Sequence, residues 1–254
     1  MLRVLYQSID RHRRPLRDHH YLAFPKFGIA YARVPGAPYQ AVAPLIDHLS
    51  TADTNAFRTA ASTARSCAWS GTMDLLTARE LKRRHPEFPV FTVVQSPGER
   101  IASAYQTVIE DADSLLPTYF SENQFDKDMS LLEFIDRACL SRDMSADNLL
   151  RSQASILKYR GQLVPDITFD LAALRDTPEQ LVERLCEYSR EEISTADVLV
   201  TPPQPKPVHT EVLQRLDVRA KLRERYRQDY QLFFDNDRET GQSRIGTLRP
   251  AEAH

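Results

Sequence analysis

The sequence predicts an α/β protein in which a central, mainly parallel sheet lies between two layers of helices. Strand-like apolar runs occur at residues 28–34, 89–94 and 166–171, and the first two are followed by segments with helical spacing of apolar residues. Strands that alternate with helices favour a parallel sheet covered on both faces, with right-handed crossovers. The 254 residues suffice for one large domain of this kind and do not demand two.

The first strand and helix are expected around a proline-rich turn. The apolar run at 28–34 ends in the turn formed by Pro35, Gly36, Ala37 and Pro38. After this turn, apolar residues spaced for one face of a helix indicate the first long helix, namely Val42, Leu45, Ile46 and Leu49. Residues 1–20 are polar and basic and are expected to form an irregular arm.

The second unit, at residues 89–109, has the clearest local signals. A buried strand is expected at 89–94, and the apolar residues of the following helix recur with helical spacing at Ile101, Ala104, Tyr105, Val108 and Ile109. Ser96 is predicted to cap this helix, with Pro97 in its first turn and Glu99 as the carboxylate of a capping box.

Later elements are predicted from similar signals. Helices are expected at 131–139 and 147–159, a strand at 166–171, and a helix that begins with a capping box at 177–180 and ends at Cys186. The proline-rich stretch 201–207 predicts an extended connector, and a long helix should carry Leu222, Tyr226, Tyr230 and Phe233 on one face. The predicted organisation is an arm at 1–20, one domain at 21–235 and a flexible tail at 236–254.

Composition excludes several classes of function. The 33 basic and 35 acidic residues give a net charge of −2, which offers no support for nucleic-acid binding. The three cysteines lie far apart without metal-type spacing, so neither a disulfide framework nor a metal site is expected. Because no apolar run is long enough to span a membrane and no signal-peptide pattern is present, we expect a cytoplasmic protein.

The stretch from Gln95 to Tyr105 carries a resemblance to a known family. It keeps Pro97, Arg100, Ser103 and Tyr105 at the spacing of the motif Arg-Asp-Pro-x-x-Arg-x-x-Ser-x-Tyr. In this respect the chain resembles the carbohydrate-type sulfotransferases, including their bacterial relatives, over roughly one domain's length. The resemblance implies a P-loop NTPase-like fold that transfers a sulfo group from 3′-phosphoadenosine 5′-phosphosulfate (PAPS) to the hydroxyl of a carbohydrate, a glycolipid or another acceptor.

The resemblance also assigns cofactor-binding positions to this chain. Gln95 and Ser103 stand where the family binds the 3′-phosphate of PAPS or of its product PAP, and Gln95 replaces an arginine. A neutral amide there forgoes a charge-assisted contact worth about 1.5–3 kcal/mol. Arg100 is expected to help hold PAPS, and the alternative for Arg100 and Ser103 is a solvated face of the helix.

A second motif of the family, Pro-Lys-x-Gly, grips the 5′-phosphosulfate. The matching loop is Pro35, Gly36 and Ala37, in which Gly36 replaces the lysine, and Pro38 removes one backbone N–H from the turn. Lys26 lies in a second Pro-Lys-x-Gly match. We interpret it as an ordinary lysine before the strand, with the alternative that it reaches the site.

Further family positions lie downstream. In Asn148–Gln153, which matches Asn-His-x-x-x-Gln, Leu149 occupies the place of the histidine that is a candidate base, and leucine cannot accept a proton. The family's Arg-x-Glu corresponds to Asp170–Ala172, in which Ala172 stands in the place of the glutamate. The segment Tyr226–Phe233 resembles the C-terminal motif Tyr-x-x-Asp-x-x-x-Phe of the family. Its aromatic side chains are expected to pack in the core. His19, His20 and His209 are interpreted as surface residues, and no catalytic residue is assigned.

These replacements leave three functions open. One is a divergent PAPS-dependent sulfotransferase. Another is a non-catalytic sulfotransferase-like protein that acts as a binding or regulatory partner, for example of a paralogous sulfotransferase. The third is a protein that binds a less charged ligand in the same crevice.

Overall fold

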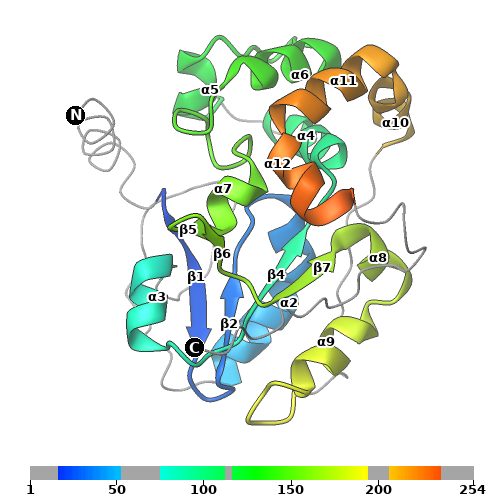
Figure 1. Cartoon of the computed structure of the whole chain (residues 1–254). Coiled ribbons are helices and arrows are strands. Elements are labelled where there is room, and N and C mark those ends of the chain that lie inside the picture. Colours follow the sequence, from blue (N-terminus) through cyan, green and yellow to red (C-terminus); the bar gives the residue numbers. More distant parts are fainter. Residues whose placement is uncertain (1–16, 53–74, 112–115, 194–205, 236–254) are drawn as a thin grey trace, which may run out of the picture.

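A computed structural model describes residues 17–52, 75–111, 116–193 and 206–235 of the chain. These residues form an α/β structure around a mixed five-stranded sheet (Figure 1). Its strand order is β3-β1-β2-β4-β7, with the bounds β1 His19–Phe24, β2 Ile29–Ala32, β3 Leu76–Thr77, β4 Val90–Val94 and β7 Ile167–Asp170. The expected arm at 1–16 and tail at 236–254 lie outside the described residues.

The parallel part of the sheet consists of β2, β4 and β7. Ala32 pairs with Thr92 and Val94 with Asp170 in parallel ladders. The first strand, β1, instead pairs antiparallel with both β2 and β3, so the sheet is mixed rather than mainly parallel. The expectation of irregular backbone up to residue 20 was wrong at His19 and His20, which begin β1.

A tight turn explains the antiparallel pair that the sequence did not predict. Phe24 and Ile29 are paired across it, and Gly28 has a φ of +67°, a conformation that favours glycine. A Cβ atom at Gly28 would lie 2.6 Å from Nε of Arg190, so this position also lacks room for a side chain.

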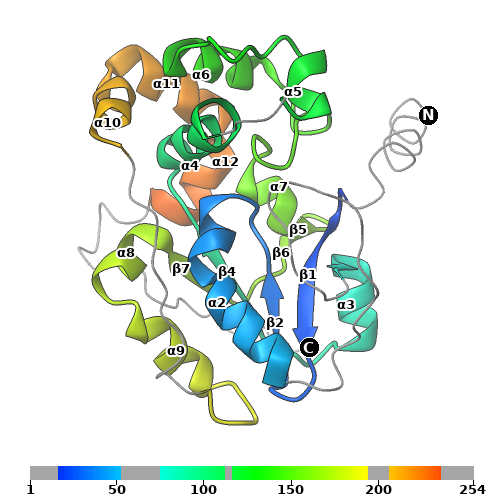
Figure 2. The same ribbon diagram turned by 180° about the vertical axis from the view of Figure 1, so that it is seen from behind.

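Helices pack on both faces of the sheet. The buried residues of α2 (Ala37–Ala52), α8 (Leu171–Asp176) and α9 (Glu179–Cys186) share one core with the side chains of one face. The other face packs against α3 (Ala78–Arg84) and α7 (Gln153–Leu157). Figure 2 shows α2 crossing the near side of the sheet.

A group of helices lies beyond the carboxyl ends of the parallel strands, at the top of Figure 1. Its core joins residues of the first and last parts of this group, including Ile101, Phe134 and Tyr226. The members are α4 (Pro97–Tyr105), the π-helical turn η1 (Gln106–Glu110), α5 (Thr118–Glu122), α6 (Leu131–Leu140), α10 (Pro207–Gln214) and α11 (Leu216–Arg225). A small hairpin, β5 (Lys158–Tyr159) with β6 (Gln162–Leu163), lies between α7 and β7.

Several helices differ from the sequence-based expectation. The helix expected at 147–159 is reduced to α7, whose cap is Ser152. The long C-terminal helix is divided into α11, α12 (Arg227–Asp229) and a π-helical turn, η2 (Tyr230–Phe234). Most of the connector at 201–207 lies outside the described residues, and Pro207 already occupies the first turn of α10.

The capping boxes also differ. Ser96 caps α4 without a side-chain hydrogen bond, and α9 begins at Glu179 after Pro178 without a capping bond. Complete capping boxes occur instead at Thr77 with Glu80 and at Ser130 with Glu133.

In the described segments, no helix is both long and apolar enough to cross a membrane. Within the same segments, His, Cys, Asp and Glu side chains do not gather in groups of three or more that could hold a metal ion. Cys139 and Cys186 are free thiols.

Candidate functional site

A ligand site is expected at the end of the sheet formed by the carboxyl ends of β2, β4 and β7. Helices α2, α4 and α8 begin directly after these three strands. Ligands of open α/β sheets bind in the crevice outside the carboxyl ends of the strands. The first backbone N–H groups of each helix have no partner within the helix and favour anions.

The loop after β2 is the predicted phosphosulfate loop. Gly36 has a φ of +97°, and its carbonyl accepts from the N–H of Gln40 at 3.1 Å to open α2. Pro35 and Ala37 are buried on either side of it. The turn therefore exists as a strand-to-helix turn, and Gly36 suits its left-handed backbone.

Leu149 lies against this loop. A Cβ atom added at Gly36 would lie 3.4 Å from Cδ2 of Leu149, and Leu149 itself is buried. The structure thus brings together the two positions at which the resemblance expects a cation and a proton acceptor. Neither chemical group is present there, because one position is glycine and the other is leucine.

Arg100 is engaged by the protein backbone. Its side chain is buried, and its Nη1 and Nη2 atoms donate to the carbonyl oxygens of Arg151 and Asn148 at 2.6 and 2.7 Å. Burial lowers the pKa of Arg100, against the opposing effects of Tyr226 and Asp229. The guanidinium therefore has a structural role, because it satisfies carbonyl groups that precede α7.

Gln95 follows β4 and is held through its backbone. Its N–H donates to Oε1 of Gln153 at 3.0 Å, and its carbonyl accepts from Nε2 of Gln153 at 2.8 Å. The amide of Gln153 therefore extends the ladder beyond the end of β4. The side-chain amide of Gln95 is itself buried, and neither its nitrogen nor its oxygen has a hydrogen-bond partner.

The last two predicted binding residues lie in different surroundings. Ser103 is half-buried, two turns into α4. Lys26 is exposed in the turn that precedes β2, with its ammonium 5.5 Å from the centre of the Phe27 ring. Lys26 precedes β2 and Gly36 follows it, so the two residues lie near opposite ends of this strand, roughly 20 Å apart at the rise of a strand. The structure does not bring Lys26 to the site.

A buried carboxylate, that of Asp229, connects the C-terminal helices to the start of α7, near the end of β4. The carboxylate of Asp229 accepts the N–H groups of Gln153 and Ala154 at 2.9 and 2.7 Å, at the start of α7. Burial raises the pKa of Asp229 to about 6, although the two N–H groups and Arg100 oppose that shift. Asp229 and Gln153 together connect α12, α7 and the end of β4.

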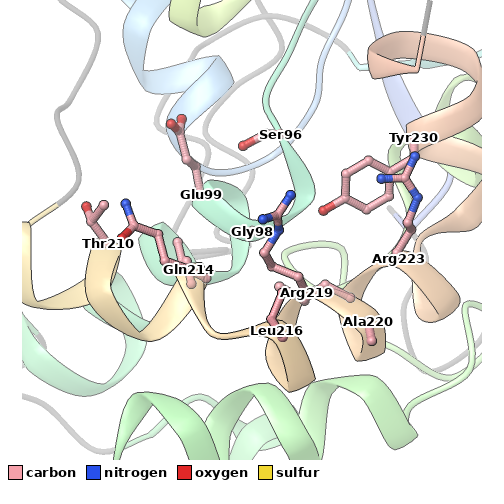
Figure 3. Close-up of a pocket in the computed structure, with 12 residues that line it drawn as sticks. Ser96, Gly98, Glu99, Thr210, Gln214, Leu216, Arg219, Ala220, Arg223 and Tyr230 are labelled. Carbon is pink, nitrogen blue, oxygen red and sulfur yellow. The ribbon is translucent and has the colours of Figure 1, made fainter. Parts of the chain in front are cut away.

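A cleft of about 550 Å³ opens beside the first turn of α4. Residues of α10 and α11 and the side chain of Tyr230 form its other walls (Figure 3). Figure 3 shows the Arg219 side chain extending from α11 toward the first turn of α4, and the Tyr230 hydroxyl pointing into the same space. The lining residues include Ser96, Gly98, Glu99, Leu213, Leu216, Arg219, Arg223 and Tyr230.

The charges of this cleft are predominantly positive. Within the described parts of the chain, the Arg219 guanidinium forms no hydrogen bond or ion pair. Arg223 pairs with Asp235 and lies 5.3 Å from the centre of the Tyr230 ring. The acidic Glu99 is paired with Arg175 at 3.1 Å. One guanidinium and the first turn of α4 are therefore available to an anion.

Sequence reasoning missed Arg219 and Arg223. They are four residues apart on α11 and so lie on one face of that helix. This spacing was the available signal, but the sequence alone did not show that α11 packs beside the start of α4.

No family model, no curated protein and no solved structure matches this chain.

The histidines have less surface exposure than expected. His209 is buried, and its Nε2 lies 3.0 Å from Oε1 of Glu110, which also accepts from Lys206 at 2.5 Å. These two contacts with Glu110 hold α10 against η1. His20 is buried at the start of β1. His19 is partly exposed and lies 4.0 Å from Glu80.

Proposed function

We propose that this chain is a sulfotransferase-like binding protein that has kept the fold of the family and does not transfer a sulfo group. Two strand–turn–helix units on neighbouring parallel strands, with helices on both faces of the sheet, support a three-layer, P-loop NTPase-like fold. The absence of transfer is proposed from one observation, the placement of the Leu149 side chain beside Gly36, 3.4 Å from where a Cβ atom of residue 36 would lie.

Sulfo transfer to a hydroxyl needs two kinds of assistance. A base removes the proton of the attacking hydroxyl, and a cation or oriented donors stabilise charge on the leaving phosphate oxygen. At the meeting point of Gly36 and Leu149 neither group is present. Arg100, the charged residue retained from the other motif, donates to backbone carbonyls instead.

The cleft in Figure 3 supports binding of an anionic ligand with an apolar part. Arg219 and the first turn of α4 suit a phosphate or sulfate group. Leu213 lines the same space, and Leu216, which is 82% exposed, lies at its rim. PAP and PAPS have these properties and are the probes of choice.

Calorimetric titration of the full chain with PAP and PAPS tests this proposal. We expect binding that Arg219→Gln weakens about tenfold, the loss of one charge-assisted contact. Arg215→Gln is the matched control, because Arg215 is an exposed arginine at the start of α11 that pairs with Asp217 and does not line the cleft. Equal affinities of wild type and Arg219→Gln would exclude the cleft as the binding site.

The second half of the test measures transfer. With PAPS labelled in its sulfo group and a panel of carbohydrate and glycolipid acceptors, we expect no labelled product. Turnover by the wild type would overturn the non-catalytic assignment in favour of a divergent sulfotransferase, the candidate that the cationic cleft also supports. Co-purification with a paralogous sulfotransferase would support a role as a binding or regulatory partner.

The cytoplasm remains our proposed compartment. Cys139 and Cys186 are free thiols, which suits a reducing environment.

A further inference from the structure

Four polar side chains are buried on the sheet near the loop after β2. His20, Tyr31, Arg33 and Gln95 have exposed fractions of 1%, 0%, 4% and 1%. We refer to these four residues as the buried polar cluster. It is separate from the cleft in Figure 3, whose lining includes none of them.

The sheet register brings the cluster together. The N–H of Arg33 donates to the carbonyl of His20 at 2.7 Å, so these residues are neighbours on β1 and β2. Tyr31 precedes Arg33 by two residues and therefore points to the same face. That face is the one covered by α2, because Tyr31 and Val93 belong to the core that α2 shares.

Gln95 belongs to the same face by the same alternation. It follows Val93 by two residues, and its backbone remains in the extended ladder through Gln153. Since Ala32 is paired with Thr92 in parallel, Gln95 lies level with Pro35, two residues beyond Arg33. The four side chains therefore lie within a few residues of one another on three adjacent strands.

Three members of the cluster have polar atoms without hydrogen-bond partners. These atoms are Nδ1 and Nε2 of His20, the hydroxyl oxygen of Tyr31, and the amide nitrogen and oxygen of Gln95. The backbone of Arg17 lies near the imidazole of His20 and that of Val34 near the Tyr31 hydroxyl, but neither contact has the geometry of a hydrogen bond. Buried polar groups of native proteins are almost always satisfied by protein, ordered water or a ligand. Several such atoms in one place are groups that a bound ligand would satisfy.

The charge of the cluster indicates what kind of ligand that would be. Burial lowers the pKa of His20 well below its ordinary value, and the guanidinium groups of Arg33 and Arg151 lower it further. His20 is therefore neutral and retains one N–H donor, while Arg33 supplies a buried positive charge. The Tyr31 hydroxyl lies near the backbone of Val34, so it reaches toward the loop.

We propose that the buried polar cluster binds a tetrahedral oxyanion, phosphate or sulfate, either free or as the end group of a larger ligand. The hydroxyl of Tyr31, the amide nitrogen of Gln95 and the imidazole N–H of His20 donate to its oxygens, and Arg33 balances its charge. A cation is disfavoured because two guanidinium groups act on the same space. This site does not depend on ligand binding in the Arg219 cleft.

The test is calorimetric titration of the full chain with inorganic sulfate and inorganic phosphate. Tyr31→Phe removes one oxygen and keeps the ring, which lies 5.0 Å from the Phe91 ring. We expect it to weaken oxyanion affinity about tenfold. Tyr21→Phe is the matched control, since Tyr21 is an equally buried tyrosine on the opposite face whose hydroxyl donates to Leu157 at 3.5 Å.

The outcomes separate the alternatives. Unchanged affinity in Tyr31→Phe, or no oxyanion binding to the wild type, would overturn the proposal and leave ordered water as the occupant. Competition between sulfate and PAP would show that the oxyanion is the end group of a nucleotide, and independent binding would show a free ion. Because Arg219→Gln tests the cleft and Tyr31→Phe tests the cluster, one can fail without the other.

Discussion

At residue 100 a guanidinium is enclosed by the protein and donates to the carbonyl oxygens of Asn148 and Arg151. These carbonyls lie just before α7, so Arg100 fixes the segment that positions Leu149 against Gly36. An arginine at this spacing can thus serve the fold alone. The same spacing that indicates a phosphate ligand in the sequence is explained here by backbone hydrogen bonds.

Replacing Arg100 should therefore destabilise the protein. Arg100→Met keeps the aliphatic stem but leaves two partly buried carbonyl groups without donors, and we expect a loss of about 3 kcal/mol in the free energy of unfolding. Urea denaturation measures it. Ser103→Ala, at a half-buried position three residues further along α4, is the control and should change stability by less than about 0.5 kcal/mol. Equal stabilities of Arg100→Met and the wild type would refute the structural role.

Asp229 should make stability depend on pH. Its pKa of about 6 in the folded state exceeds its ordinary value of 3.8, so the folded state binds the proton more tightly. This contribution is fully present below pH 3.8 and is lost as the pH rises to about 6, a change of about 3 kcal/mol. The comparison is with Asp229→Asn, which does not titrate. The stability difference between wild type and variant should shrink from pH 4 to pH 7, whereas parallel curves would contradict the shift.

At the scale of single elements, the starts of α4 and α6 differ in how they are capped. Ser130 accepts from the N–H of Glu133, and the Glu133 carboxylate accepts from the N–H of Ser130 at 2.8 Å. Ser96 at the start of α4 makes no such bond, and Glu99 instead pairs with Arg175. The first turn of α4, which lines the cleft at Gly98 and Glu99, thus has no side-chain cap.

This difference predicts unequal effects of two serine substitutions. Ser130→Ala should cost about 1 kcal/mol because it removes a complete cap, whereas Ser96→Ala should cost only a few tenths. Thermal unfolding of both variants measures the contrast. A larger loss for Ser96→Ala would show that its hydroxyl caps α4 in solution.

Local signals in the sequence predicted several elements well. The apolar spacing around Val42 and Ile101 corresponds to α2 and α4, and the run at 89–94 corresponds to β4. The strand β1 was missed because its two histidines follow a strongly basic segment. The division of the C-terminal helix could not be predicted, since the aromatic spacing from Leu222 to Phe233 continues smoothly through the break.

At the scale of the whole molecule, the candidate site joins segments that are far apart in sequence. Arg219 of α11 lies beside the first turn of α4, and Leu149 lies against Gly36. The sequence predicted the candidate binding positions at the ends of β2 and β4, because both strands were expected to be parallel neighbours. The cleft and the buried polar cluster did not, because they depend on helix packing and on the antiparallel pairing of β1.

The longest connection runs from the C-terminal helices to the centre of the sheet. Asp229 holds the first N–H groups of α7, and the side chain of Gln153 holds the backbone of Gln95. Both sets of bonds depend on the placement of one residue, Gln153. The end of β4 should therefore be energetically coupled to α12.

A double-mutant cycle measures that coupling. Gln153→Leu removes two buried hydrogen bonds to Gln95, and Asp229→Asn weakens the anchor of α7. Each should destabilise by about 1–3 kcal/mol. Because both act on Gln153, we expect the double variant to differ from additivity by about 0.5–3 kcal/mol in urea denaturation. Asp229→Asn with Ser130→Ala, which shares no hydrogen-bond partner with Asp229, should be additive. Additivity in both pairs would mean that α12 and the end of β4 are stabilised independently.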